Sequence, residues 1–226
     1  MDRKKYDCYE RIEARRNRLK NDHRILPIDD LGAGSSLLRE SRRSVGAITR
    51  SSLKSPKYAR LLFRMARYFK PGTILELGTS FGLTTAYLAS ADPNCRVLSL
   101  EGSTAIAEIA RENFAALELK NIEIIEGDFS ETLTQALSRT GPVEFVFIDG
   151  NHRKDPTLNY FKQLVEFNNH STVLVFDDIY WSREMEEAWV QIKSDPAVTL
   201  SVDLFFLGLV FFTPAIKFKQ DFTIRF

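Results

Sequence analysis

The segment TILELGTSFG, residues 73–82, joins an apolar run to a turn that contains two glycines. The run carries a carboxylate, Glu76, which a strand that only filled a core would not place there. Gly78 and Gly82 allow tight curvature and close approach of a ligand, and a following helix would offer its N-terminal amides. The segment therefore predicts a strand, a turn and a helix that hold a small molecule, although a plain strand–turn–helix joint would use the same glycines.

Strand-like and helical segments alternate from residue 73 onward. The strand-like runs lie at 73–77, 96–100, 121–125, 143–148 and 171–176, and the helical segments at 83–90, 103–118, 130–139, 155–168 and 182–194. Such alternation is typical of a parallel sheet with helices on both faces. We therefore expect an α/β fold with a Rossmann-like, doubly wound, mostly parallel seven-stranded sheet.

The end of the chain follows another pattern. Residues 198–214 contain two strand-like runs with a break near 205–208, which is too short for a helical crossover. We therefore expect a C-terminal antiparallel hairpin at the edge of the sheet. The apolar run LFFLGLVFF, residues 204–212, would form the core of this hairpin or a contact in a homodimer. The tail, residues 215–226, has no expected place.

The segment before the sheet is basic. Residues 1–70 contain 19 Lys and Arg against 8 Asp and Glu, whereas residues 71–226 contain 12 against 22. A basic segment can attract nucleic acid or an anionic membrane, but no aromatic side chains are interleaved here to stack on bases. We favour basic helices that dock on the acidic body of the same or a neighbouring subunit.

The expected domain organisation has two parts. Residues 3–20 have helical spacing with a weak apolar face, residues 26–36 have the composition of a loop, and residues 56–69 form an amphipathic helix that begins with a proline. We expect a basic helical N-terminal extension at 1–55, in which 26–55 acts as a lid. One domain is expected at 56–226.

Composition favours a cytoplasmic protein. No apolar run approaches the roughly 20 residues that a membrane helix needs, so we expect no membrane span. The N-terminal residues lack the apolar core of a signal peptide. The cysteines, Cys8 and Cys95, lie far apart and form no CxxC motif, which argues against a disulfide framework or a zinc site.

Acidic residues also end the second and third strands of the pattern. Glu101 lies in LSLEGS, nineteen residues after Gly82, where a carboxylate can accept both hydroxyls of a ribose. Asp128 lies in IIEGDFS, where it can accept from an exocyclic amine while Phe129 lies against a base. Each acid alone could be a helix cap or a solvated strand end. Together with Glu76 they indicate a nucleoside site on three successive strands.

These motifs resemble those of the class I S-adenosylmethionine (SAM)-dependent methyltransferases, over roughly residues 45–213. ELGTSFG matches their E-x-G-x-x-x-G motif, LEGS their ribose-binding tip and EGDF their adenine-contacting tip. The resemblance implies that the cofactor is SAM. Its methionine part would be held by Glu76, Gly78, Ser80 and Gly82. Its ribose would be held by Glu101 and Gly102, and its adenine by Asp128 and Phe129. Many members have a glycine where this chain has Ser80, but the form that this chain shows is familiar among small-molecule O-methyltransferases. A site for NAD would instead require G-x-G-x-x-G.

Further carboxylates follow the fourth and fifth strands. Asp149 lies in FVFIDG, and the pair Asp177 and Asp178 follows VLVF, so the three should meet at the edge of the sheet that holds the glycine turn. Carboxylates so placed repel unless protonated or bridged, and oxygen ligands suit Mg²⁺. Alternatively, Asp178 caps the helix that begins near Ser182 and Asp149 faces the sulfonium.

The same region resembles the divalent-metal-dependent catechol-type O-methyltransferases. The resemblance implies that Asp149, Asp177 and Asp178 bind Mg²⁺, which would hold and acidify a substrate hydroxyl. These enzymes place a lysine three residues after the first metal-binding aspartate, and here that position is His152. Histidine titrates near neutral pH and can take a hydroxyl proton, so we expect His152 to be the base, with Lys154 in reserve, unless both belong to an ordinary loop.

The expected function is SAM-dependent transfer of a methyl group to a hydroxyl of a small molecule, with Mg²⁺ assisting. Tyr180 and Trp181, just past the fifth strand, are candidate walls for the acceptor. The alternatives are a metal-independent N- or C-methyltransferase, a non-catalytic SAM-binding protein, and a nucleic-acid methyltransferase. The last is disfavoured because no N/D-P-P-Y/F motif follows the fourth strand.

Overall fold

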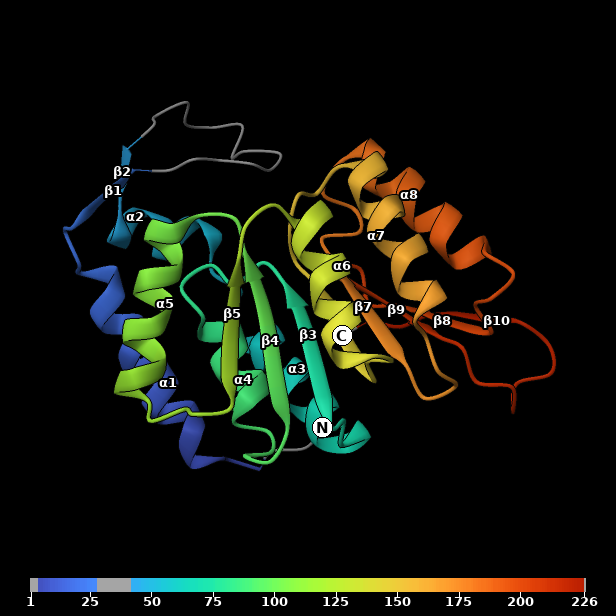
Figure 1. Ribbon diagram of the computed structural model, residues 1–226, viewed down its shortest axis with the longest axis horizontal. Helices are drawn as coiled ribbons and strands as arrows, with labels where there is room; N and C mark the ends of the chain where they lie inside the picture. The colour runs from blue at the N-terminus through green and yellow to red at the C-terminus, as the bar shows by residue number, and fades with distance from the viewer. Residues whose placement is uncertain (1–3, 28–41, 226) are drawn as a thin grey trace.

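The computed structural model describes residues 4–27 and 42–225, and a twisted sheet is the central feature of these residues (Figure 1). Within them the main sheet has eight strands, in the order β10-β8-β9-β7-β6-β3-β4-β5. The strands are β3 (Thr73–Leu77), β4 (Arg96–Glu101), β5 (Ile122–Glu126), β6 (Phe145–Ile148), β7 (Val173–Asp177), β8 (Leu200–Asp203), β9 (Leu207–Phe211) and β10 (Gln220–Thr223).

The pairing of the strands confirms the predicted fold class. Strands β5, β4, β3, β6 and β7 pair in parallel. Strand β9 runs antiparallel to both β7 and β8, which is the predicted closing hairpin. The tail that had no expected place contributes β10, which pairs in parallel with β8 and makes the sheet one strand wider than the seven predicted.

The helices begin and end close to the predicted residues. Helix α3, for example, spans the 56–69 segment, and Pro56 in its first turn explains where it begins. The helices are α1 (Asp7–Lys20), α2 (Val45–Ser52), α3 (Pro56–Phe69), α4 (Leu83–Ala89), α5 (Thr104–Ala116), α6 (Phe129–Thr140), α7 (Lys154–Glu166) and α8 (Arg183–Ser194). No helix in the described part of the chain is both long and apolar enough to cross a bilayer.

Each face of the sheet packs against its own set of helices. Side chains alternate along a strand, so Ile74 packs with α1, α3 and α4 in one core, whereas Leu75 and Leu77 pack with α6, α7 and α8 in the other. Figure 1 shows α6, α7 and α8 together on one side of the view, and α1, α2 and α5 on the other. Glu76 therefore points toward the face that α4 covers.

The N-terminal segment contains elements that the sequence did not indicate. Strands β1 (Ile25–Pro27) and β2 (Arg42–Ser44) pair antiparallel, and α2 follows β2 directly. Most of the expected loop at 26–36 lies outside the described residues, and the lid and the boundary at residue 55 stay predictions. Tyr9, Ile12 and Leu19 of α1 lie in the same core as the sheet.

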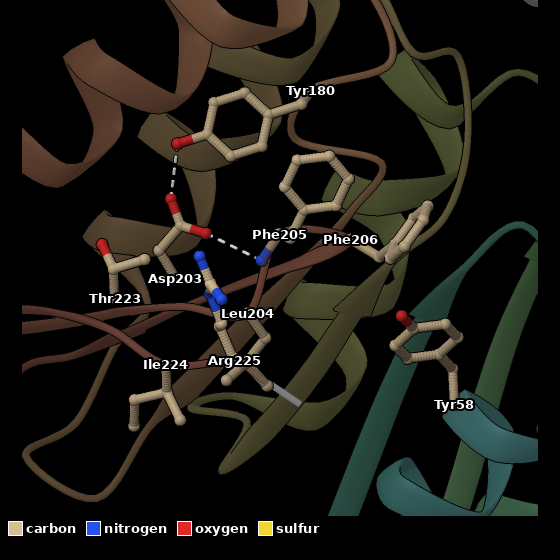
Figure 2. Close-up of a pocket in the computed structure, with 9 residues that line it drawn as sticks. All are labelled: Tyr58, Tyr180, Asp203, Leu204, Phe205, Phe206, Thr223, Ile224 and Arg225. Atoms are coloured by element: carbon tan, nitrogen blue, oxygen red, sulfur yellow. Dashed lines mark hydrogen bonds between the residues drawn. The ribbon is translucent and has the colours of Figure 1, made fainter.

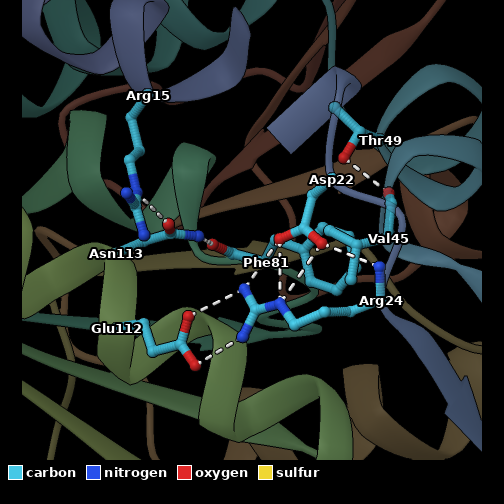
Figure 3. Close-up of polar contacts among 8 residues, drawn as sticks. All are labelled: Arg15, Asp22, Arg24, Val45, Thr49, Phe81, Glu112 and Asn113. Carbon is cyan, nitrogen blue, oxygen red and sulfur yellow. Dashed lines mark hydrogen bonds and ion pairs between the residues drawn. The ribbon is translucent and has the colours of Figure 1, made fainter. Parts of the chain in front are cut away.

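Charged side chains attach this segment to α5 (Figure 3). Arg24 donates to both oxygens of Glu112, at 2.8 and 2.9 Å. Arg15 donates to the buried side chain of Asn113, whose Nδ2 donates to the carbonyl of Phe81 at 2.7 Å. These contacts agree with the interpretation that the basic segment docks on the body of its own chain, and they connect α1 to the glycine turn.

The tip of β3 lies directly against the tip of β6. Gly78 follows β3 with φ of +103°, and a Cβ built on it would lie 2.1 Å from the carbonyl oxygen of Asp149. Two features exclude a side chain at this position: the positive φ of its backbone and the carbonyl oxygen of Asp149 beside it. The two strand tips can meet only if residue 78 is glycine.

We predict that Gly78→Ala destabilises the protein by more than about 2 kcal/mol, since it adds a backbone clash to the cost of a positive φ. Gly141→Ala is the matched control, because Gly141 also has positive φ, +67°, but a Cβ added there would meet no atom within 4 Å. That variant should lose about 1 kcal/mol. Urea unfolding of both variants measures the difference, and equal losses would contradict the close contact.

Candidate active site

Glu76 is a buried carboxylate with one unsatisfied oxygen. Its side chain is 0% exposed. Oε2 accepts hydrogen bonds from Thr85 at 2.5 Å and Ser99 at 2.6 Å, whereas Oε1 has no partner. Burial raises the pKa of Glu76 to about 8, against the lowering effect of the two hydroxyls. A buried acceptor without a donor is costly, so Oε1 is a candidate contact for the donor group of a ligand.

The glycine turn after β3 has the backbone strain expected of a binding turn. Ser80 has φ of 48° and Gly82 φ of 74°. The amide of Ser80 donates to Oε2 of Glu101 at 2.8 Å, so the end of β4 holds the turn in place. A Cβ on Gly82 would meet the ring of Phe114 at 2.4 Å, and this glycine therefore allows α5 to pack on the turn.

Glu101 ends β4 at the same edge of the sheet as the glycine turn. Its Oε1 accepts from the amide of Ser103 at 3.0 Å, and burial raises the pKa of its carboxyl. The side chain is 8% exposed, and each oxygen of the carboxylate keeps a further lone pair. Glu101 thus shapes the turn with one set of hydrogen bonds and can still accept the hydroxyls of a ribose. Gly102 follows it directly at the strand end.

The tip of β5 carries the two residues predicted for a base. Asp128 is exposed and caps α6, because its Oδ1 accepts from the amide and hydroxyl of Ser130, which lower the pKa of its carboxyl. The ring of Phe129 lies near Tyr160, with centroids 6.2 Å apart, and covers Gly150 after β6. The helix cap that was the alternative for Asp128 is thus present, and Oδ2 remains available at the surface.

A cluster of titratable groups lies where β6 and β7 end. Asp149, His152 and Asp177 each bring one ligand atom within 4.8 Å of the others. His152 Nε2 lies 3.6 Å from Asp149 Oδ1. Asp177 is 1% exposed, and its Oδ1 has no hydrogen-bond partner. The cluster resembles a metal site in its donors, but a cation of the chain already contacts it.

That cation is Lys54, which sequence reasoning missed. Its Nζ is paired with Oδ2 of Asp177 and lies 3.8 Å from Oδ2 of Asp149. Lys54 lies between α2 and α3, 123 positions before its partner, and no local motif could have indicated the contact. A divalent ion at this cluster would have to compete with the Lys54 ammonium for the charge of Asp177, even if it bound the unpartnered Oδ1.

Asp178 and Lys154 lie apart from this cluster. Asp178 has φ of 50° and is not among the converging donors of the described residues. Nor does it cap α8, whose N-cap is Ser182. Lys154 donates to Glu187 of α8 at 2.8 Å, which raises the pKa of its ammonium. The roles predicted for both residues stay predictions, and Lys154 is the less well placed of the two candidate bases.

An aromatic cavity of about 670 Å³ adjoins the end of β7 (Figure 2). Tyr58 of α3 packs against Phe206 in its wall, with ring centroids 5.1 Å apart, and Tyr180 stacks on Phe205 at 5.6 Å. The amide of Asp178 donates to the carbonyl of Phe206 at 2.8 Å, which places the cavity wall beside the strand tip. The lining residues are Tyr58, Tyr180, Asp203, Leu204, Phe205, Phe206, Thr223, Ile224 and Arg225.

The cavity agrees in part with the predicted acceptor walls. Tyr180 lines it, whereas Trp181 is 61% exposed and is not a lining residue. The apolar run at 204–212 is divided: Leu207, Leu209 and Val210 lie in the core, as expected of a hairpin, but Phe205 and Phe206 line the cavity.

Comparison with known proteins relates these features to one family. Residues 75–179 match the model of a family described as "Methyltransferase domain". The O-methyltransferase imqG of Aspergillus flavus is 35% identical over 111 residues, which cover 46% of this chain and 44% of that protein. The catechol O-methyltransferase of Niastella koreensis is 30% identical over 128 residues, 55% of this chain and 57% of that protein. The chain thus spans about half the length of the curated relatives it matches.

Solved structures confirm the fold. An O-methyltransferase from Bacillus cereus in complex with S-adenosylhomocysteine (SAH) aligns with a TM-score of 0.66 and 20% identity, over 93% of each chain. At this identity the likeness shows the fold alone. The family model and the two curated O-methyltransferases confirm the predicted resemblance to methyltransferases.

We predict that Glu76 makes the fold less stable as pH rises. The usual carboxyl pKa is 4.5, and the folded value is about 8. Between these values the unfolded chain loses the proton while the folded chain keeps it, so the free energy of unfolding falls with rising pH, by at most roughly 1.4 kcal/mol per pKa unit. Glu76→Gln carries no titrating proton, so its free energy of unfolding should fall less between pH 5.5 and 8.

Urea unfolding at several pH values measures this difference. Glu123→Gln is the control, because hydrogen bonds from Arg96 and Arg139 lower the pKa of Glu123 and leave it ionised in both states above pH 5.5. Its difference from the wild type should therefore stay constant over this range. Parallel curves for Glu76→Gln and the wild type would show that Glu76 is not protonated in the fold.

Proposed function

We propose that this chain is a SAM-dependent methyltransferase that transfers a methyl group to a hydroxyl of a small molecule. The observation that carries the proposal is the unsatisfied Oε1 of Glu76, buried beneath a glycine turn at the carboxyl edge of a parallel sheet. An ammonium group, such as that of the methionine part of SAM, supplies the donor and charge that this oxygen lacks. A phosphate brings acceptor oxygens and negative charge in place of a donor and would oppose ionisation of Glu76, which argues against a dinucleotide.

The other cofactor contacts follow from the ends of neighbouring strands. Glu101 would accept the ribose hydroxyls, and Gly102 leaves room beside them. Asp128 would accept from the exocyclic amine of adenine, against which Phe129 would pack. Gly78, Ser80 and Gly82 shape the turn around the methionine part. When bound, SAM supplies a methyl group activated by its sulfonium.

The acceptor would approach from the side of β6 and β7. His152 would take the proton of the acceptor hydroxyl as the oxygen–carbon bond forms and the carbon–sulfur bond breaks, leaving SAH. The aromatic rings of Tyr58, Tyr180 and Phe206 suit a flat acceptor, and a cavity of about 670 Å³ suits a small one. Most of the rate enhancement in such a displacement comes from in-line alignment.

The predicted Mg²⁺ fits the site only in part. Asp149 and Asp177 offer oxygen ligands and His152 a nitrogen, but Asp178 is outside the group and Lys54 contacts Asp177. Mg²⁺ prefers several oxygen ligands in octahedral geometry. No step of the proposed reaction is therefore assigned to a metal.

Calorimetric titration with SAH tests the proposal. The wild type should bind SAH, and Glu76→Gln should bind it about 10- to 100-fold more weakly, because a charged hydrogen bond is worth roughly 1.5–3 kcal/mol. Glu126→Gln is the control: it neutralises an acid at the neighbouring end of β5, whose carboxylate accepts from Arg111, and should keep its affinity. Failure of the wild type to bind SAH would refute the proposed function.

We also predict that His152→Gln lowers methyl transfer by about 10²- to 10⁴-fold without weakening SAH binding, as expected for loss of a general base. Catechol and SAM with a labelled methyl group serve as probe substrates. Lys154→Gln is the control, since its ammonium is directed to Glu187 and its loss should leave the rate within a few fold of the wild type. The reverse result would make Lys154 the base.

A further inference from the structure

The pair formed by Lys54 and Asp177 is nearly enclosed by the protein. Their side chains are 12% and 1% exposed, and that of Asp149 is 21% exposed. Enclosed carboxylates repel one another and lose hydration, so the cluster needs a positive charge close by. Lys54 provides this charge from a segment that precedes the family match at residues 75–179.

The backbone around Lys54 holds it at this place. It lies in the short connection between α2 and α3, and Ser55 and Pro56 then begin α3. The carbonyl of Ser55 accepts from the amide of Tyr58 at 3.1 Å, which closes the first turn of the helix. Tyr58 lines the aromatic cavity, so the same turn presents both the ammonium and one wall of the cavity.

The ammonium keeps donor capacity after these contacts. It has three protons, of which one serves Oδ2 of Asp177 and a second faces Oδ2 of Asp149 at 3.8 Å. The third is free to reach an oxygen brought in by an acceptor. Oδ1 of Asp177, which is buried without a partner, can in turn accept a hydrogen bond from a second donor group of that acceptor, while the reacting hydroxyl gives its proton to His152.

We propose that Lys54 supplies the cation of the acceptor site, in the place predicted for Mg²⁺, and donates a hydrogen bond to the acceptor oxygen. The role of Lys54 toward the acceptor rests on the proposed methyl transfer. Lys54 and a divalent ion would compete for the negative charge of Asp149 and Asp177, so the ammonium weakens binding of the ion. The ammonium neutralises the carboxylates and orients the hydroxyl that His152 deprotonates.

This assignment widens the range of acceptors that the site can take. A divalent ion binds two adjacent oxygens of a catechol at once, whereas one ammonium proton binds one oxygen. The site therefore takes an aromatic acceptor with a single hydroxyl as well as one with a vicinal pair. Methyl transfer should continue at an undiminished rate in EDTA.

Electron paramagnetic resonance can follow the binding of Mn²⁺ to the protein saturated with SAH. This experiment tests, without measuring activity, whether Lys54 keeps a divalent ion out of the cluster. The wild type should bind Mn²⁺ at this cluster at least about tenfold more weakly than Lys54→Met, because truncating one partner of an enclosed ion pair leaves its charge uncompensated. Asp177→Asn in the Lys54→Met background should abolish the gain. Lys162→Met, which removes the same charge from an exposed position of α7, should bind Mn²⁺ like the wild type.

Lys54→Arg is a second variant that keeps the proposal testable if Lys54→Met fails to fold. It keeps a cation beside Asp177 and should exclude Mn²⁺ as the wild type does. Equal Mn²⁺ affinity in the wild type and Lys54→Met, lost in Asp177→Asn, would overturn the proposal, because a metal would then displace Lys54 without penalty. Wild-type turnover that EDTA abolishes and Mn²⁺ restores would also overturn it. Loss of SAH binding by the wild type, in contrast, would refute the methyltransferase function itself.

Discussion

Parallel pairing of β3 with β4 on one side and β6 on the other is the constraint on which the site depends. The register aligns Leu77 with Leu100 and with Ile148, so all three strands end at one edge. Residues that follow these strands are thereby forced together, whatever their distance along the chain. Gly78 permits the closest of these approaches, and the acids at the strand ends then share one rim.

Acidic side chains gathered at one edge of the sheet repel one another and lose hydration, and the fold compensates each of them differently. Glu76 is buried with two hydroxyl donors and a pKa near 8, so a proton can replace a counter-ion. Glu101 accepts from backbone amides, and Asp177 has Lys54. Non-glycine residues with positive φ, among them Ser80 and His152, also lie at these strand ends. Strain and unpaired charge concentrate where a ligand can compensate them.

The sequence predicted those features of the fold and of the site that depend on residues close together along the chain. Alternation of apolar runs and helices predicted the parallel sheet, and the acid at each strand tip could be read directly, because parallel strands place their carboxyl ends together. The eighth strand at Gln220–Thr223 was missed, since its four residues are exposed and weakly patterned. The expected position of Asp178 in the acid cluster followed from adjacency to Asp177, but successive residues point in different directions.

Lys54 shows the limit of such reasoning. A lysine in a polar connection has no periodicity or motif, and its partner lies 123 positions away. The matched family region begins at residue 75, whereas Lys54 and Tyr58 come before it. In the proposed reaction, the methyl donor would lie against strand ends common to the fold, and a segment outside the match would complete the acceptor side. Proteins that share this sheet can therefore bind the same methyl donor and still differ in the cation and the acceptor they use, because those depend on residues that the common core does not specify.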